Sequence, residues 1–453
     1  MQQIFQPQRT LGRLLMLVLL SAASSTASAL PSFARQTGED CAACHVGGIG
    51  PQLTPHGTKF KIGGYTDGDN AEKFWVPMSG QAITTSTHTS KDQPGGAAPG
   101  YKANDNTIFQ EGSVFLAGRF APHVGGFVQG TYSGVDHAWS WDNVDLRAAL
   151  PLQLGGGETT FGVSLNNSPS TQDPFNTLPS WSFPYVSSDL TPGYLGEPLL
   201  AGGLGQLSTG LTGYAYINEW VYAEAGAYRD LPGDFLSSVG VPREDRVNLD
   251  GAAPYWRLHV GHEFKHQYAS LGLFGLDASI QPDPGAGAKD QYRDIGIDGT
   301  YQFIGTHRNI FSVNARYIRE KQDLNATVAE GGAERNNATL TEYNFSASYY
   351  YLNTYGFTVG AFGTGGDTDQ TLYAAADIEG SRTGKPDTQG TIWQIDYTPW
   401  GKEASWMAPW ANLRLALQYT AYSQFNGASS DYDGAGRDAS DNNTLMAFAW
   451  LAF

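Results

Sequence analysis

The amino-acid sequence predicts an all-β protein, an antiparallel transmembrane β-barrel of about 16 strands that follows a small N-terminal segment. Composition is the first indication, because the 453 residues include 56 glycines, 24 tyrosines, 22 phenylalanines and 11 tryptophans. Beyond the N-terminal 30 residues no run of 18 apolar residues occurs, so no transmembrane helix is predicted. Glycine- and aromatic-rich chains with short alternating segments are typical of outer-membrane barrels. A water-soluble all-β protein can share this composition, so the segments themselves must decide.

Apolar and polar residues alternate along these segments, which indicates strands with one apolar and one polar face. Between residues 309 and 319, Phe311 and Tyr317 share one face, and Ser312 and Arg316 share the other. In a barrel the apolar face contacts lipid and the charged face lines a polar lumen. A soluble sandwich would show the same alternation with its apolar face inside, so periodicity alone leaves both folds open.

The lengths of the connections favour the barrel. Candidate strands lie at residues 78–90, 107–119, 122–133, 140–152, 157–167, 207–217, 219–230, 254–265, 268–280, 290–302, 308–320, 338–351, 354–363, 390–399, 410–424 and 442–453. Tight turns, as at Ala121, Asn218 and Gly305, alternate with longer connections, as at 91–106 and 168–206. Short periplasmic turns and long extracellular loops are the pattern of bacterial outer-membrane barrels.

The end of the chain fits the same fold. Residues 442–453 alternate, with Leu445 on one face and Phe448 and Trp450 on the other, and the chain ends at Phe453. A terminal aromatic strand is typical of outer-membrane barrels, so the bacterial outer membrane is the predicted location. A barrel of 16 strands is wide enough for an aqueous lumen, which the N-terminal segment could enter as a plug.

Residues 1–29 have the features of a secretory signal peptide. Arg9 and Arg13 precede a short apolar run at 14–20, and Ala27-Ser28-Ala29 forms a cleavage site. Without these two arginines the mature chain has 25 Lys+Arg against 44 Asp+Glu, a formal charge of −19. Such an acidic chain is not expected to bind nucleic acid, which requires a basic face.

The motif with the most specific chemical meaning is Cys41-Ala42-Ala43-Cys44-His45. C-x-x-C-H is the attachment signal of c-type haem, in which both thiols form thioethers and the histidine becomes the proximal iron ligand. The chain has only two cysteines, and both lie in this motif. A thioredoxin-like pair would need a βαβ pattern, and a structural zinc site would need four ligands. Residues 30–77 are therefore predicted to be a monohaem cytochrome c segment, with the barrel at residues 78–453.

Several residues could supply the second axial ligand of the haem iron. Met78 is the first methionine after the motif and would give Met/His ligation. His56 is close to the motif in sequence, and His88 lies at the far end of the first predicted strand. More distant histidines, His123 and His137, or a five-coordinate iron are the remaining options.

The last long loop carries four carboxylates, Asp431, Asp433, Asp438 and Asp441. Carboxylates suit small divalent cations, so a cation-contacting loop is one interpretation and a solvated acidic loop is the other. The sequence shows no Ser/His/Asp triad, phosphate-binding loop or paired-carboxylate pattern, so no catalytic residues are predicted beyond the haem.

Other short stretches resemble one known family. They are Ala34-Arg35-Gln36-Thr37-Gly38, Leu53-Thr54-Pro55-His56-Gly57, Phe60-Lys61-Ile62-Gly63-Gly64-Tyr65, Asp396-Tyr397-Thr398-Pro399, Phe425-Asn426-Gly427 and Asp441-Asn442-Asn443-Thr444. With the haem motif, they resemble the fused outer-membrane monohaem cytochrome–porins, a family best known for iron-oxidising members. The resemblance spans essentially the whole mature chain. His56 departs from it, because relatives often have an aromatic residue there.

The resemblance implies an outer-membrane electron-transfer protein with one covalent haem c. It would oxidise extracellular Fe(II), or accept an electron from another extracellular donor, and pass that electron to a periplasmic cytochrome c or similar carrier. The alternative is a diffusion porin or transporter with a haem-bearing plug, whose selectivity would depend on Asp294, Asp298, Arg316 and Arg414. A soluble periplasmic cytochrome with an all-β partner domain is a third possibility.

Overall fold

Sixteen strands form one closed barrel, in which each strand is antiparallel to its neighbours and the last pairs with the first. The computed structural model describes residues 30–68, 77–242, 246–283, 285 and 287–453, and the predicted signal peptide lies outside them. The strands are β1 (Met78–Thr89), β2 (Asn106–Ala121), β3 (Val124–Ser133), β4 (Ala138–Leu154), β5 (Gly157–Asn166), β6 (Ser208–Ile217), β7 (Val221–Asp230), β8 (Ala253–Phe264), β9 (Gln267–Ile280), β10 (Asp290–Phe303), β11 (Asn309–Asp323), β12 (Asn337–Tyr351), β13 (Tyr355–Gly366), β14 (Thr388–Tyr397), β15 (Asn412–Gln424) and β16 (Thr444–Ala452). All 16 predicted strands are confirmed, each to within three residues at either end.

The outer surface of the barrel is apolar. Phe311 and Tyr317 of β11 are 39% and 44% exposed, whereas Arg316, on the opposite face of the strand, is 6% exposed. Large exposed tryptophans, Trp406 and Trp410, lie in the connection between β14 and β15. An apolar band with aromatic residues at its edge is the surface of a barrel that spans an outer membrane. This observation excludes the soluble sandwich, in which the same apolar faces would be buried.

Among the described residues no helix is long and apolar enough to cross a membrane.

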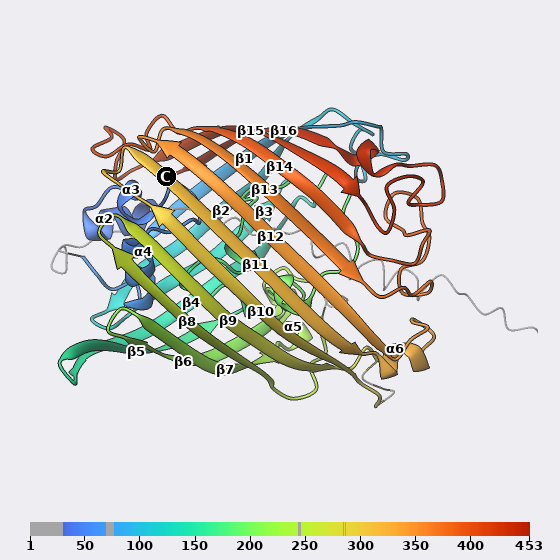
Figure 1. Cartoon of the computed structure of the whole chain (residues 1–453), viewed down its shortest axis with the longest axis horizontal. Coiled ribbons are helices and arrows are strands. Elements are labelled where there is room, and N and C mark those ends of the chain that lie inside the picture. The colour runs from blue at the N-terminus through green and yellow to red at the C-terminus, as the bar shows by residue number, and fades with distance from the viewer. Residues whose placement is uncertain (1–29, 69–76, 243–245, 284, 286) are drawn as a thin grey trace, which may run out of the picture.

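The first and last strands pair along their length, from Gln81 with Ala452 to Thr89 with Thr444, and so close the barrel. Gly80 and Phe453 exchange two backbone hydrogen bonds, of 2.7 and 2.9 Å. Figure 1 shows the three N-terminal helices at the end of the barrel that carries the short turns and the long loops at the other. The predicted asymmetry between short turns and long loops is therefore confirmed.

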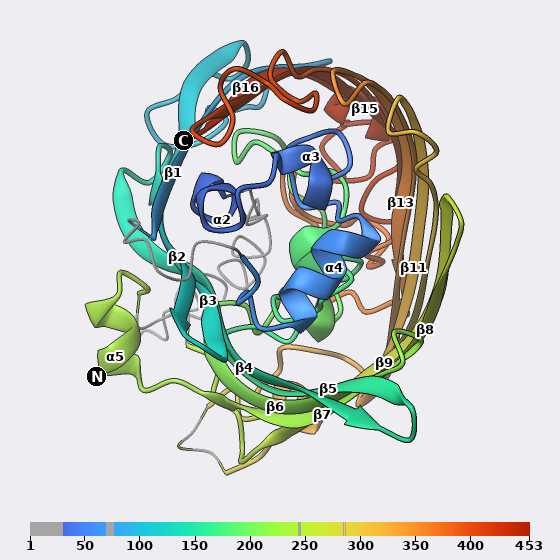
Figure 2. The ribbon, with the colours of Figure 1, turned by 90° about the vertical axis from the view of Figure 1, so that its left-hand side faces the viewer.

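Residues 30–68 lie inside the ring of strands, and we call them the plug (Figure 2). The plug contains α2 (Pro31–Thr37), α3 (Cys41–Cys44) and α4 (Pro55–Ile62). The helix α4 begins after Thr54, whose hydroxyl accepts a hydrogen bond from the Gly57 amide, and proline occupies its first position. The helix α2 ends at Gly38, which has a φ of 77°. The predicted entry of the N-terminal segment into the lumen is confirmed.

Polar side chains of the lumen wall hold the plug through its backbone. Gln302 of β10 donates to the carbonyl of Leu53 at 2.8 Å, and Arg414 of β15 donates to that of Ile49 at 2.7 Å. A segment with little regular structure leaves many backbone groups unpaired, and inside a barrel these must find partners. The predicted lumen residue Arg414 is thus a contact between the wall and the plug.

The connection between β5 and β6 differs from the prediction. The sequence predicts an extracellular loop at residues 168–206, but residues 167–207 fold into the lumen, and we call them the inner loop. Leu178, Trp181 and Leu200 of this loop are at most 3% exposed. The length of a connection does not show whether it folds into the lumen or extends away from the barrel. It folds inward where its apolar side chains can be buried against the lumen wall or the plug.

Hydrogen bonds join the inner loop to strands around the wall. Gln110 of β2 donates to the carboxylate of Asp189, and Asn344 of β12 donates to a backbone carbonyl of the loop. The amide of Leu200 donates to Asp294 of β10 at 2.8 Å. These partners lie on well-separated strands, so the inner loop crosses the lumen. Together with the plug it forms two layers of chain inside the barrel.

Candidate haem-binding site

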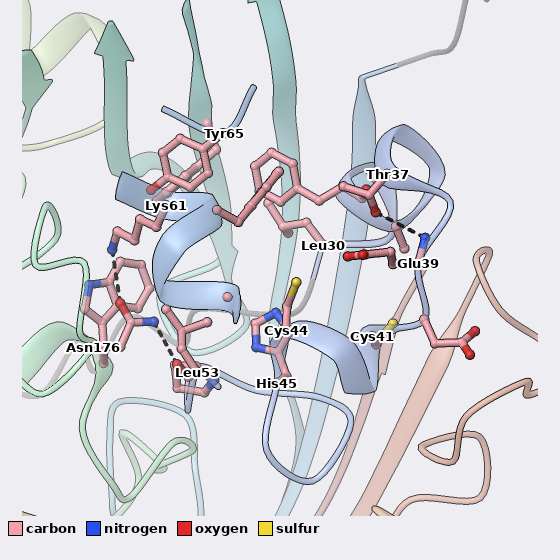
Figure 3. A pocket seen from close by; sticks show the side chains of 18 of the residues that line it. Leu30, Thr37, Glu39, Cys41, Cys44, His45, Leu53, Lys61, Tyr65 and Asn176 are labelled. Atoms are coloured by element: carbon pink, nitrogen blue, oxygen red, sulfur yellow. Dashed lines mark hydrogen bonds between the residues drawn. The ribbon is translucent and has the colours of Figure 1, made fainter. Parts of the chain in front are cut away.

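Cys41, Cys44 and His45 line a single cavity between the plug, the wall and the inner loop (Figure 3). Most of the lining is apolar and comes from the plug, from β3 and from the inner loop. Its large apolar residues are Leu30, Phe33, Leu53, Phe60, Phe127 and Trp181. An apolar cavity that two thiols and an imidazole enter from one short segment is the environment that a c-type haem needs.

Local helix geometry brings the motif side chains together. Cys41 and Cys44 are three residues apart in α3, so their side chains share one face of the helical turn. His45 follows with extended backbone, and its amide donates to the Cys41 carbonyl at 2.9 Å. A Cβ on Gly57 of α4 would overlap the Cys44 carbonyl. Glycine at this position therefore lets α4 pack directly against the motif.

Burial determines the protonation of these three groups. It raises the pKa of Cys41 to about 11 and that of Cys44 to about 12, so both are neutral thiols at pH 7. Burial lowers the pKa of His45 to about 4, which leaves a neutral imidazole, the form that ligates metals. The Nδ1 atom of His45 is buried and has no hydrogen-bond partner among the described residues. Two thiols and a neutral imidazole facing one apolar cavity fit a covalently attached haem.

The alternative of a closed zinc site does not match the geometry. Among the described residues, the potential ligand atoms that lie close enough to share an ion belong to Glu39, Cys44 and His56, all within 4.8 Å of one another. Cys41 and His45 are outside this group. A structural zinc site requires four converging ligands, usually including both cysteines of such a pair.

The five candidates for the second axial ligand, Met78, His56, His88, His123 and His137, lie outside the lining of the cavity. Met78 is 50% exposed at the start of β1. His56 forms an exposed ion pair with Glu39 at 2.7 Å, and His88 forms one with Asp105 at 2.7 Å. Of these residues, His56 lies near the motif, because the ligand atoms of His56, Cys44 and Glu39 are within 4.8 Å of one another.

The four aspartates of the last long loop stabilise the loop itself. Asp433 and Asp431 each accept hydrogen bonds from backbone amides of the same loop. Asp438 and Asp441 form a capping box at the start of the short helix η5 (Ala439–Asn442). Carboxylate oxygens used in this way favour a structural role over the predicted contact with a cation.

The sequence pattern does not single out Lys61, Asn176 and Trp181, although all three line the cavity. Lys61 of α4 donates to the Asn176 side chain at 3.0 Å and to the Thr171 carbonyl at 2.9 Å. Its ammonium also lies 4.6 Å from the centre of the Trp181 ring. These contacts join the plug to the inner loop. No local pattern connects a lysine with a loop 110 positions away.

Buried ion pairs attach the inner loop to the wall. Arg257 of β8 contacts Asp298 of β10 and, at 3.4 Å, Asp173 of the inner loop, and all three side chains are almost fully buried. Arg316 of β11 bonds Glu342 of β12 at 2.6 and 3.1 Å and donates to an inner-loop carbonyl at 2.9 Å. The predicted lumen charges Asp298 and Arg316 therefore belong to a network that holds the loop.

Raising the pH is expected to loosen the inner loop. Burial, together with the charge of Glu342, raises the pKa of Glu197 in this loop to about 8. This pKa lies above the unfolded value of about 4.3, so the folded loop holds a proton whose stabilising contribution is lost as the pH rises through 8. Hydrogen exchange of the inner loop, corrected for intrinsic rates, should accelerate from about pH 5 to about pH 8 and level off at higher pH. The variant Glu197→Gln should lack this pH dependence, and an unchanged dependence would contradict the assignment.

Comparison with known proteins gives only distant likenesses. No protein-family model and no curated protein matches the chain. OmpT, an outer-membrane protein of Vibrio cholerae, is 13% identical over 85% of this chain and 100% of that chain, with a TM-score of 0.41. The outer-membrane channel DcaP of Acinetobacter baumannii is 10% identical over 83% of this chain and 96% of that chain, with a TM-score of 0.46. OprB of Pseudomonas putida is 10% identical over 83% of this chain and 93% of that chain, also with a TM-score of 0.46. The assignment of the barrel therefore rests on its own strand pairing and apolar surface.

Proposed function

We propose that this protein is an outer-membrane electron-transfer cytochrome of the fused monohaem cytochrome–porin type. It would take one electron from an extracellular donor, with Fe(II) as the leading candidate, and deliver that electron to a periplasmic carrier. The observation that carries the proposal is that Cys41, Cys44 and His45 line one mostly apolar cavity inside a closed barrel. A thiol pair and a histidine in this position have no evident use in solute diffusion.

The residues of the cavity have distinct roles in this proposal. Cys41 and Cys44 would hold the haem through thioethers, and His45 would ligate its iron. Bound haem c supplies a one-electron redox centre. The apolar residues of the lining would surround the macrocycle, while Glu39 and Asp40 make the cysteine side of the cavity acidic. An acidic surface there would attract a basic periplasmic carrier.

The two layers in the lumen would separate the donor from the acceptor. Extracellular Fe(II) would lose one electron and become Fe(III), and an oxidised periplasmic cytochrome c or similar carrier would gain that electron. Trp181 lines both the haem cavity and a smaller polar cavity beside Phe183 and Arg316. The electron would cross the inner loop at this shared wall.

A reduction assay tests the proposal. Fe(II) added to outer-membrane fractions that hold the haem-loaded protein should reduce the haem, which is followed through its α-band. The variant Cys44→Ala, which lacks one thioether, should show no comparable reduction. A haem that stays oxidised with Fe(II) but is reduced by dithionite would remove Fe(II) as the donor.

A diffusion porin or transporter with a haem-bearing plug is the second candidate. A 16-stranded barrel is the architecture of general porins, and the lumen wall carries charges that could select solutes, among them Asp294 and Arg414. Ion conductance distinguishes the two functions, because an electron conduit needs no open channel.

A further inference from the structure

The cavity contains a buried cation to which the proposed function assigns no role. Lys61 is 4% exposed and lines the cavity from α4. Its ammonium donates to the Thr171 carbonyl and to the Asn176 side chain, at 2.9 and 3.0 Å. An ammonium group has three N–H donors. Its other contact is with the Trp181 ring, whose centre is 4.6 Å away, and among the described residues no third oxygen accepts a hydrogen bond from it.

Charge is distributed unevenly around the cavity. Of the described residues that line it, Lys61 is the one basic side chain, whereas Glu39 and Asp40 are acidic. Figure 3 shows Glu39 and Cys41 on one side of the cavity and Lys61 and Asn176 on the other, with the remaining motif residues between them. An anionic ligand group that entered the cavity would therefore be repelled on the cysteine side and attracted on the lysine side.

The ammonium of Lys61 also lacks sufficient negative charge around it. Burial, together with the positive charge of Arg147, lowers the pKa of Lys61 to about 7, even though Asp145, Asp173 and Glu224 act in the opposite direction. Burying an ammonium group is costly unless an anion compensates the charge. A carboxylate placed in the cavity would supply the missing compensation.

A covalent haem would bring such a carboxylate to this place. The vinyl groups of haem and its two propionates lie on opposite edges of the macrocycle. Thioethers at Cys41 and Cys44 would hold the vinyl edge on the acidic side of the cavity and direct the propionates across it. We propose that Lys61 binds a haem propionate, fixes the orientation of the macrocycle and raises the reduction potential of the iron. This inference rests on the proposed haem attachment.

The effect on the potential follows from charge. The oxidised iron centre carries one more positive charge than the reduced centre, so a nearby ammonium disfavours the oxidised form. Removing the ammonium should therefore lower the potential. Replacing it with guanidinium should preserve the potential, because arginine keeps the charge and donates to carboxylates.

The test uses the full-length, haem-loaded protein in outer-membrane fractions, with the variants Lys61→Met and Lys61→Arg. Lys61→Gln, which keeps hydrogen bonding without the charge, serves as a second test if the methionine variant does not accumulate. Lys59→Met is the matched control, because Lys59 lies on the same helix in an exposed ion pair with Glu219. Asn176→Ala loosens the same contact between plug and inner loop but leaves the cation in place.

Covalent haem, measured by the mass of the haem peptide, should be present in the wild type and in these variants. Its absence from the wild type would overturn the proposed haem attachment, whereas the following readouts concern Lys61 alone. At the wild-type midpoint potential, Lys61→Met should lower the ratio of reduced to oxidised haem about tenfold, which corresponds to about 59 mV for one electron. Its propionate bands in resonance Raman spectra should also shift, while Lys61→Arg and both controls stay close to wild type. A haem-loaded Lys61→Met protein with wild-type potential and wild-type propionate bands would overturn the inference.

Discussion

Deleting both layers in the lumen is expected to turn the barrel into an open channel, whereas the full chain should pass little ion current. The plug and the inner loop each reach several strands of the wall, so either layer should obstruct the lumen without the other. Gln302 and Arg414 hold the plug, while Gln110 and Asn344 hold the inner loop. A 16-stranded barrel without internal segments leaves an aqueous lumen, so the double deletion should give the largest conductance steps.

Planar-bilayer recordings would measure this effect in four proteins. These are the full chain, a chain lacking residues 30–68, a chain with residues 168–206 replaced by a short glycine/serine linker, and the combination. Correct folding of each barrel would be confirmed by its resistance to unfolding in sodium dodecyl sulfate without heating. Large steps from the full chain would contradict the closed lumen and favour the porin function over the electron conduit.

Arg257→Met is expected to release the inner loop from the wall. The variant leaves the carboxylates of Asp173 and Asp298 close together without the cation that joins them. Removing one partner of a buried ion pair costs roughly 3–5 kcal/mol. Hydrogen exchange of the inner loop should therefore accelerate by roughly two to four orders of magnitude, with a smaller effect on the strands, which keep their own hydrogen bonds.

Arg293→Met is the matched control for this experiment. Arg293 also lies on a barrel strand and forms an ion pair with Asp277 at 3.0 Å, but the two side chains are 52% and 48% exposed. Exposed pairs contribute little because water screens both charges. Equal effects of the two substitutions would show that the loss of the buried ion pair is not what releases the loop.

The positions of the strands are predictable because successive residues face lipid and lumen in turn, so apolar and polar side chains alternate along each strand. Tyr317 and Arg316 are adjacent in sequence, and their opposite exposures repeat a pattern that is present throughout the barrel. The side chains of the haem motif are predictable for a similar reason, since one turn of helix is enough to bring Cys41 and Cys44 together. Both inferences depend on interactions within a few residues of chain.

The rest of the site depends on contacts that no local pattern encodes. The five predicted candidates for a second iron ligand are near the motif in sequence or near a strand end, yet none lines the cavity. Lys61 and Trp181 do line it, although nothing in their neighbourhoods distinguishes them from an ordinary helix lysine and an ordinary loop tryptophan. Their roles arise only when the plug and the inner loop occupy the same lumen.

The sequence by itself determined the number of strands, their positions to within three residues, the lipid-facing residues and the presence of the Cys41–His45 motif, because periodicity and short motifs are local properties of the chain. Only the tertiary structure decided that residues 167–207 fold inward, that Arg257 joins them to the wall and that Lys61 faces the cavity. The direction of a loop is set by whether distant strands offer it apolar surface and counter-charges. Such partners exist only after the barrel has closed around it.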